Sequence, residues 1–372
     1  MLARGVLAAL LLLLTFAPTL AWAACEAAAG GVRRCPMTFN GKAREYFIHV
    51  PATGGTPRPL VVVLHGGEYV QDLSAPPLIR AAVNDGSSAM EAGADSLNVM
   101  VAYPRAWCMA APCTGGGVDN FQWNLGPEAC GAFGACEDDV GFVNAAIADI
   151  KANFSTDASN VAIAGHSGGG FLVFRMFCEV GGNQHATVGW VISATLTAGE
   201  VANCTNPTPT RLIIVNGTQD PAVPYTPAPG AGVNCGIGIG NICTNTIGIP
   251  FLPTGYAAFQ VLALGARGGS RSPDQWRSTN FWGTSLAVDG NCLTTVEHIG
   301  ARVTVGAVGS GVIAPFLVPR PDGGCYVNDG VAGDAFDGGG HAWPGSNTDY
   351  GVGKKTLFFN TSPAILSTVT GG

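Results

Sequence analysis

The stretch Val161–Gly170, which reads VAIAGHSGGG, constrains the fold of this chain more than any other. Its first four residues are small or branched and apolar, as in a short buried strand, and Gly165–Gly169 then fits the pattern G-x-S-x-G. A helix-like apolar face follows, formed by Phe171, Leu172, Phe174 and Cys178. A strand, a tight turn and a helix are the context in which such a serine is held in a strained conformation as a nucleophile. Ser167 is therefore a candidate nucleophile.

The same short pattern also arises by chance in glycine-rich chains, and this chain has 54 glycines. The strand before Ser167 and the helix after it are what favour the catalytic interpretation. His166 lies inside the turn, and a neighbour of the serine cannot easily turn its ring back onto the serine oxygen. We therefore expect His166 to pack or to line the rim. No Lys-Ser/Thr pair follows the glycines, which argues against a phosphate-binding loop.

Short apolar strands alternate with helical patterns along the chain. Strands buried on both faces are predicted at 60–64, 99–103, 161–164, 188–194 and 212–215. Residues 138–154 predict a helix with an acidic start, and residues 43–51 alternate as in an edge strand. This order predicts an α/β fold, with a mostly parallel, doubly wound sheet. Two long Gly- and Pro-rich loops, 104–136 and 226–272, are expected to form walls of a substrate cleft.

Two further residues complete a candidate nucleophilic site. Asp220 follows the strand at 212–215, and His341 lies in the glycine-rich loop GGGHAWPG. The carboxyl ends of neighbouring parallel strands converge on one edge of a sheet, so Asp220 is expected near Ser167. The chain order Ser, Asp, His is that of α/β-hydrolases. A loop-capping role for Asp220 is the alternative. Of the other histidines considered, His49 lies in a predicted strand, His65 precedes the expected oxyanion loop, and His185 and His298 have no glycine-rich loop around them.

The loop after the strand at 60–64 reads His65-Gly66-Gly67. In this fold the corresponding loop donates one backbone N–H to the oxyanion, and the residue after the nucleophile donates the other. We expect Gly67 and Gly168 to be these donors, with Glu68 as the alternative to Gly67.

The first 24 residues predict a signal peptide, since Arg4 precedes the apolar run 6–16 and an Ala-x-Ala site at 21–23. Lipidation at Cys25 is an alternative. We expect a secreted protein with one catalytic domain over 25–372. The 12 cysteines contain no C-x-x-C, which favours disulfides over zinc. Close pairs are Cys25/Cys35, Cys108/Cys113, Cys130/Cys136 and Cys235/Cys243, which leaves Cys178/Cys204 and Cys292/Cys325, although sequence does not fix the connectivity.

Composition limits the partners. The net charge is −7 and no run of Lys or Arg occurs, which argues against nucleic acid and anionic membranes. No segment after the signal peptide is long and apolar enough to span a bilayer. No metal or organic cofactor is expected for this chemistry. Charged residues make up only 12% of the chain, a weakly charged composition that suits an exported protein acting on apolar or insoluble material.

Six motifs in order resemble those of the polyhydroxybutyrate depolymerase and feruloyl esterase group of secreted α/β-hydrolases: LHGG, YPRAW, EDDVGF, AGHSGGG, VNGTQDPAVPY and GGGHAWPG. The resemblance covers roughly residues 35–350. It implies Ser167 as nucleophile, Asp220 as acid and His341 as base, and it also implies the cysteine pair Cys292/Cys325. Gly67 and Gly168 depart from the group's usual residues, as does the long insertion after Tyr225.

The resemblance implies an ester substrate and leaves its class open. A polyhydroxybutyrate-type polyester fits the weakly charged composition, whereas a feruloyl or acetyl group on plant polysaccharide would use the same three residues. Trp343 and Trp123 are candidate substrate-binding residues, with core packing as the alternative for both. A secreted binding protein on an inactive hydrolase scaffold is a further alternative, but such a protein would normally lack one of the three catalytic residues.

Overall fold

The computed structural model describes residues 25–70, 72–85, 89–108, 119–126, 136–179, 181–194, 211–217, 234–235, 243–244, 250–251, 294–299, 341–343, 346, 351–352 and 361–370. The predicted signal peptide, Asp220 and the pair Cys292/Cys325 lie outside these residues.

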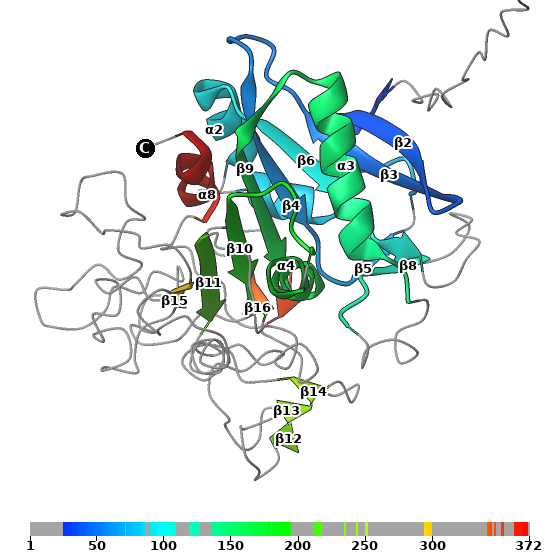
Figure 1. Ribbon diagram of the computed structural model, residues 1–372, viewed down its shortest axis with the longest axis vertical. Coiled ribbons are helices and arrows are strands. Elements are labelled where there is room, and N and C mark those ends of the chain that lie inside the picture. The colour runs from blue at the N-terminus through cyan, green and yellow to red at the C-terminus, as the bar shows by residue number, and fades with distance from the viewer. Residues whose placement is uncertain are drawn as a thin grey trace, which may run out of the picture.

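Nine described strands form one sheet (Figure 1). In spatial order they are β1 (Glu26–Ala27), β2 (Arg33–Phe39), β3 (Lys42–His49), β6 (Met100–Pro104), β4 (Arg58–Leu64), β9 (Thr156–His166), β10 (Val188–Ile192), β11 (Arg211–Gly217) and β15 (Thr294–Ile299). The five strands from β6 to β11 are mutually parallel. Antiparallel strands flank them on both sides. The predicted parallel sheet is thus confirmed at its centre.

Helices cover both faces of this sheet, because alternate strand side chains are apolar on each face. On one face, residues such as Leu60, Val62 and Ile163 pack against α3 (Asp139–Asn153) and α4 (Gly168–Cys178). On the other face, Val61, Val63 and Ala162 pack against the helices α1 (Ile79–Asn84), α2 (Met90–Leu97) and α8 (Thr361–Thr370). Figure 1 shows α3 running across the front of the sheet. The side chain of Asp138 accepts a hydrogen bond from the Gly141 N–H and caps α3, as the acidic start predicted.

The predicted edge position of residues 43–51 is wrong. The strand there, β3, lies between β2 and β6 and is antiparallel to both. The true neighbour on the outer side is β2, whose sequence RRCPMTF carries two arginines and a proline. Proline and charge weaken the strand signal, so β2 did not stand out as a strand.

The central strand β9 turns through Ser167 directly into α4. A parallel sheet whose central strand ends in a serine at the start of a helix is the architecture of an α/β-hydrolase. The fold class predicted from the sequence is therefore confirmed.

The two segments expected to be long loops contain short strands. Within 104–136, β7 (Trp107–Cys108) and β8 (Asp119–Gln122) form a small sheet with β5 (Glu68–Val70), which follows the His65-Gly66-Gly67 loop. Within 226–272, the strands are β12 (Asn234–Cys235), β13 (Cys243–Thr244) and β14 (Pro250–Phe251). The first small sheet attaches the loop beyond β6 to the loop beyond β4.

Disulfides are present, as predicted. Cys25 is bonded to Cys35, which joins the start of β1 to β2. Cys108, Cys136 and Cys178 are also disulfide-bonded, and their predicted partners stay predictions. The backbones of Cys235 and Cys243 lie directly opposite each other in β12 and β13.

Candidate active site

Ser167 occupies the turn between β9 and α4 with φ 51° and ψ −121°. Positive φ is uncommon for a residue with a side chain and costs on the order of 1–3 kcal/mol. The Ser167 N–H donates to the carbonyl of Ile192, at 2.9 Å, which fastens the turn to the end of β10. The turn is therefore held by the neighbouring parallel strand as well as by its own helix.

Two glycines make this turn possible. A Cβ atom on Gly165 would lie 2.2 Å from the carbonyl oxygen of Gly169, and a Cβ on Gly169 would lie 2.4 Å from the carbonyl oxygen of Leu64. Both distances are far below a normal contact, and the atoms met belong to backbone that cannot move aside. The G-x-S-x-G pattern is thus required here by close packing of α4 against β9 and β4.

The structure brings Ser167 and His341 together across 174 residues of sequence. His341 Nε2 lies 2.8 Å from Ser167 Oγ, which is a hydrogen-bond distance. His341 belongs to the short strand β16 (His341–Ala342), paired with β17 (Gly351–Val352), and is only 6% exposed. A serine hydroxyl in contact with an imidazole nitrogen is the arrangement in which a base can take the hydroxyl proton.

Asp220 lies outside the described residues, and its position stays a prediction. The strand that precedes it, β11, is parallel to β10, with Val215 opposite Ile192, and Ile192 in turn lies opposite His166. The carboxyl ends of these three strands therefore lie at one edge of the sheet. The chain leaves β11 at Gly217, three residues before Asp220 and at the same edge as Ser167.

His166 packs beneath the candidate base. Its ring centroid lies 4.9 Å from that of His341, and the side chain is buried. Burial, and after it the charge that His341 would carry, lowers the pKa of His166 well below the ordinary histidine value. His166 is therefore neutral at physiological pH, and the expectation that it packs is confirmed. Its contact with His341 was not predictable, because it depends on a loop 175 residues away.

The two predicted oxyanion segments are adjacent. A Cβ atom built on Gly168 lies 3.8 Å from the carbonyl carbon of Gly66, to which the amide nitrogen of Gly67 is bonded. Gly168 is also the first residue of α4, where backbone N–H groups lack partners within the helix. The side chain of Glu68, whose backbone was the alternative donor, accepts hydrogen bonds from the N–H groups of Leu78 and Ile79 at the start of α1.

The other described histidine side chains have partners elsewhere. His49 on β3 is hydrogen-bonded to Asp95 at 2.8 Å, and His185 lies 3.4 Å from the ammonium of Lys151. The ring of His65 contacts the backbone of Gly66 and Ala106. Among the histidine side chains that the structure describes, His341 is the one hydrogen-bonded to Ser167.

Both candidate substrate-binding tryptophans are buried, which agrees with the core-packing alternative given for them. Trp343 is fully buried against α8 and donates its indole N–H to Ser362 Oγ at 3.3 Å. Trp123 is 2% exposed and donates its indole N–H to the carbonyl of His65 at 2.7 Å. Both rings are core residues. An aromatic ring beside a catalytic loop looks the same in sequence whether it lines a cleft or packs beneath it.

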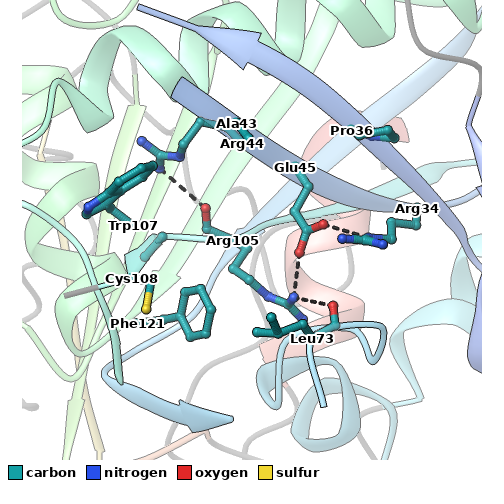
Figure 2. Close-up of a pocket in the computed structure, with 11 residues that line it drawn as sticks. Arg34, Pro36, Ala43, Arg44, Glu45, Leu73, Arg105, Trp107, Cys108 and Phe121 are labelled. Atoms are coloured by element: carbon teal, nitrogen blue, oxygen red, sulfur yellow. Dashed lines mark hydrogen bonds and ion pairs between the residues drawn. The ribbon is translucent and has the colours of Figure 1, made fainter. Parts of the chain in front are cut away.

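A separate cavity of about 330 Å³ lies between β3 and the small sheet, and neither Ser167 nor His341 lines it (Figure 2). Figure 2 shows Arg105 extending across its floor from the end of β6 to Glu45 and the Leu73 carbonyl. Trp107 and Phe121 form part of its wall. The charged groups of the floor pair with one another, because Glu45 accepts hydrogen bonds from both Arg105 and Arg34.

Within the described ranges, no group of three His, Cys, Asp or Glu side chains could hold a metal ion. Of the helices in that part of the chain, none has the length and apolar character needed to cross a bilayer.

No family model matches the chain, and no curated protein matches it. Solved structures do resemble it distantly. One is a thermostable esterase, 17% identical, with 48% of this chain and 45% of that chain covered and a TM-score of 0.33. A second is the poly(3-hydroxybutyrate) depolymerase LpqC from Bordetella parapertussis. It is 19% identical, with 54% of this chain and 70% of that chain covered and a TM-score of 0.33. A third is an acetyl xylan esterase from Aspergillus awamori. It is 16% identical, with 40% of this chain and 46% of that chain covered and a TM-score of 0.28. The chain thus spans about half the length of the first of these structures.

Proposed function

We propose that this chain is a secreted serine esterase that hydrolyses a polymeric carboxylic ester. The observation that carries the proposal is the contact between Ser167 Oγ and His341 Nε2 at 2.8 Å, made at a strained turn at the carboxyl end of a parallel sheet. Asp220 is proposed as the third member, and the backbone N–H groups of Gly67 and Gly168 as the oxyanion donors. Residues 1–24 are proposed to direct export as a signal peptide and to be absent from the mature protein.

The mechanism proceeds through an acyl-enzyme. His341 Nε2 takes the proton of Ser167 as Oγ attacks the ester carbonyl, and the oxyanion is stabilised by the N–H groups of Gly67 and Gly168. Asp220 accepts a hydrogen bond from the other ring nitrogen of His341 and stabilises the imidazolium. His341 then gives the proton to the departing alcohol. Water, activated by the same imidazole, releases the acid and restores Ser167.

A polyhydroxybutyrate-type polyester is proposed as the substrate. The chain is 47% apolar and only 12% charged, which suits contact with an insoluble, uncharged polymer. The six ordered motifs, which resemble those of the depolymerase and feruloyl esterase group, support an ester of this general class. A feruloyl or acetyl ester on polysaccharide is the substrate that the experiment must separate from it.

The test of the reaction compares Ser167→Ala with Ser193→Ala. Ser193 directly follows the neighbouring strand β10, is buried and also has a positive φ, 51°, so both substitutions place alanine at a residue with positive φ. Ser167→Ala is expected to abolish p-nitrophenyl butyrate hydrolysis while the thermal midpoint is kept. Ser193→Ala is expected to retain activity. Activity that persists in Ser167→Ala would contradict the proposal.

The test of the substrate uses the mature chain on two solids. Release of soluble hydroxy acids from a polyhydroxybutyrate film, without release of ferulate or acetate from feruloylated and acetylated arabinoxylan, is the expected result. The opposite pattern would make the protein a polysaccharide esterase. Ser167→Ala serves as the blank for both solids.

A further inference from the structure

The imidazole of His65 is fully buried behind the loop that the proposed function uses as an oxyanion donor. Two backbone groups lie at its two ring nitrogens. The Ala106 N–H donates to Nε2 at 2.9 Å, and Nδ1 lies 2.5 Å from the carbonyl oxygen of Gly66. Both contacts are therefore with loops at the carboxyl ends of parallel strands, β6 and β4.

These contacts determine which nitrogen carries the proton. Because Nε2 accepts from the Ala106 N–H, it carries no proton. The neutral ring therefore has its proton on Nδ1, which donates it to the Gly66 carbonyl. A buried ring with a single tautomer and two fixed partners is a rigid donor.

The Gly66 carbonyl and the Gly67 N–H belong to one peptide unit. That unit is planar and trans, so its C=O and N–H point in opposite directions. Fixing the carbonyl toward His65 consequently turns the Gly67 N–H away from the ring. The geometry points to His65 as the positioning residue that orients the Gly67 N–H for the oxyanion, an inference that rests on the proposed function.

The surroundings of His65 support this role. The indole N–H of Trp123 donates to the His65 carbonyl at 2.7 Å, so two successive carbonyls of the loop are held by buried donors. On the other side, Arg105 donates to Glu45 and to the Leu73 carbonyl (Figure 2). It also donates to the Ala75 carbonyl, and these bonds anchor the segment that carries Ala106. The YPRAW motif, residues 103–107, thus provides the anchored Ala106 N–H that donates to His65 Nε2.

The role does not depend on a change of charge. Burial is the main reason that the pKa of His65 is lowered to about 3. The hydrogen bond to the Gly66 carbonyl raises this pKa, and the positive charges of Arg105 and Arg44 lower it further. The Nδ1–H donor therefore persists at any pH at which an esterase assay is practical. Glu68, whose Oε1 lies 3.7 Å from Nδ1, is engaged with the N-terminus of α1.

Two substitutions separate orientation from packing. In His65→Asn, the side-chain amide nitrogen takes the place of Nδ1 and can still donate to the Gly66 carbonyl. In His65→Gln, the side-chain oxygen takes the place of Nε2 and can accept from Ala106, but the donor to Gly66 is lost. Each variant loses one of the two hydrogen bonds, so a merely structural role predicts similar losses of activity and of thermal midpoint.

The positioning role predicts a difference between them. With p-nitrophenyl butyrate, His65→Gln is expected to lose about 10- to 100-fold in kcat with KM little changed, below the loss for a deleted oxyanion donor. His65→Asn is expected to stay within about 5-fold of wild type. The Ki of a trifluoromethyl ketone, which forms a tetrahedral adduct on Ser167, should rise in His65→Gln in proportion to the loss of kcat/KM.

Equal kcat values for the two variants would overturn the positioning role. A wild-type chain without Ser167-dependent hydrolysis would instead refute the proposed function. If neither variant folds, ¹⁵N NMR of the histidine rings in the wild-type chain decides the matter. The expected result is an Nδ1–H ring for His65 that does not titrate between pH 5 and 8, whereas an Nε2–H ring would overturn the inference.

Discussion

The ring of His166 lies 4.9 Å from the ring of His341, at an angle of 52°, so the residue before the candidate nucleophile supports the candidate base. His166 projects from the last position of β9, whereas His341 comes from a loop strand. Because His166 is buried and neutral, it can lie against the imidazolium that forms during the proposed reaction without like-charge repulsion. The proposed centre therefore contains two imidazoles, of which one exchanges protons.

Buried neutral histidines should make the protein acid-sensitive. The pKa of His65 is lowered to about 3, chiefly by burial, and that of His166 well below 6.5 for the same first reason. In the unfolded chain both are protonated below about pH 6.5. The unfolded state therefore binds more protons, and stability is lost as pH falls from about 6.5 toward the folded values. We expect a loss of about 1.4 kcal/mol per pH unit for each ring below pH 6.

Denaturant unfolding at pH 5, 6, 7 and 8 checks this prediction. Burial raises the pKa of Asp139 and Asp149, and this increases the free energy of unfolding as pH falls. To isolate the contribution of one histidine, the pH dependence of the wild type is compared with that of His65→Asn. Between pH 6 and 5 the free energy of unfolding of that variant should fall by about 1.4 kcal/mol less than that of the wild type. An unchanged slope would mean that His65 is protonated in the folded state.

Adjacent glycines in the turn should respond differently to alanine. A Cβ on Gly168 meets Leu125, Trp123 and Gly66 at 3.6–3.8 Å, ordinary contact distances. A Cβ on Gly169 would lie 2.4 Å from the Leu64 carbonyl oxygen. Gly168→Ala is expected to keep or slightly raise stability, since alanine favours a helix over glycine by about 1 kcal/mol. Gly169→Ala is expected to lose about 3 kcal/mol or more. Thermal midpoints of the two variants check this, and equal midpoints would contradict the packing described for α4.

The sequence was sufficient for the turn at Ser167 because its glycines are dictated by local sterics. Gly165 and Gly169 have no alternative where α4 packs against β9 and β4. The pairing of Ser167 with His341 was also predictable, since the fold fixes which strand ends share an edge. Local sterics and the strand order of the sheet therefore point to the same site.

Other features depended on contacts that no pattern encodes. The position of β3 inside the sheet followed from β2, whose Pro36 and arginines hide its strand character. The burial of Trp343 depends on α8, nearly 20 residues later, and that of Trp123 on the small sheet beside β4. The role of His65 rests on its contact with the adjacent Gly66 carbonyl and on the Ala106 N–H, which reaches the ring only once β4 and β6 are neighbours.

The buried ion pair between Arg44 and Asp139 should be essential to stability. Arg44 Nη2 lies 2.7 Å from Asp139 Oδ1, with side-chain exposures of 3% and 1%, and Asp139 also accepts from the Asn124 N–H. Arg44→Met leaves a buried carboxylate without its cation, which we expect to cost about 3–5 kcal/mol. Adding Asp139→Asn should recover part of this loss. Denaturant unfolding of both variants measures it.

A matched control comes from the same strand and the same end of α3. Lys42 pairs with Glu137, but its side chain is 43% exposed. Lys42→Met is therefore expected to cost less than about 1 kcal/mol. A loss as large as that of Arg44→Met would mean that burial of the Arg44–Asp139 pair does not make it the more important of the two.

The proposed acid, Asp220, is tested by Asp220→Asn. An amide in this position would favour the wrong tautomer of His341 and leave the imidazolium unsupported, so kcat is expected to fall about 10⁴-fold at neutral pH with little change in KM. Asp157→Asn is the control. Asp157 is half-buried at the amino end of β9, the end opposite Ser167, and accepts hydrogen bonds from Ser159 and Asn160. Because it is far along the strand from Ser167, its substitution should leave kcat within about 2-fold of wild type. Steady-state kinetics with p-nitrophenyl butyrate measures both variants. A loss of less than about tenfold for Asp220→Asn would assign the acid to another carboxylate and leave Ser167 and His341 in place.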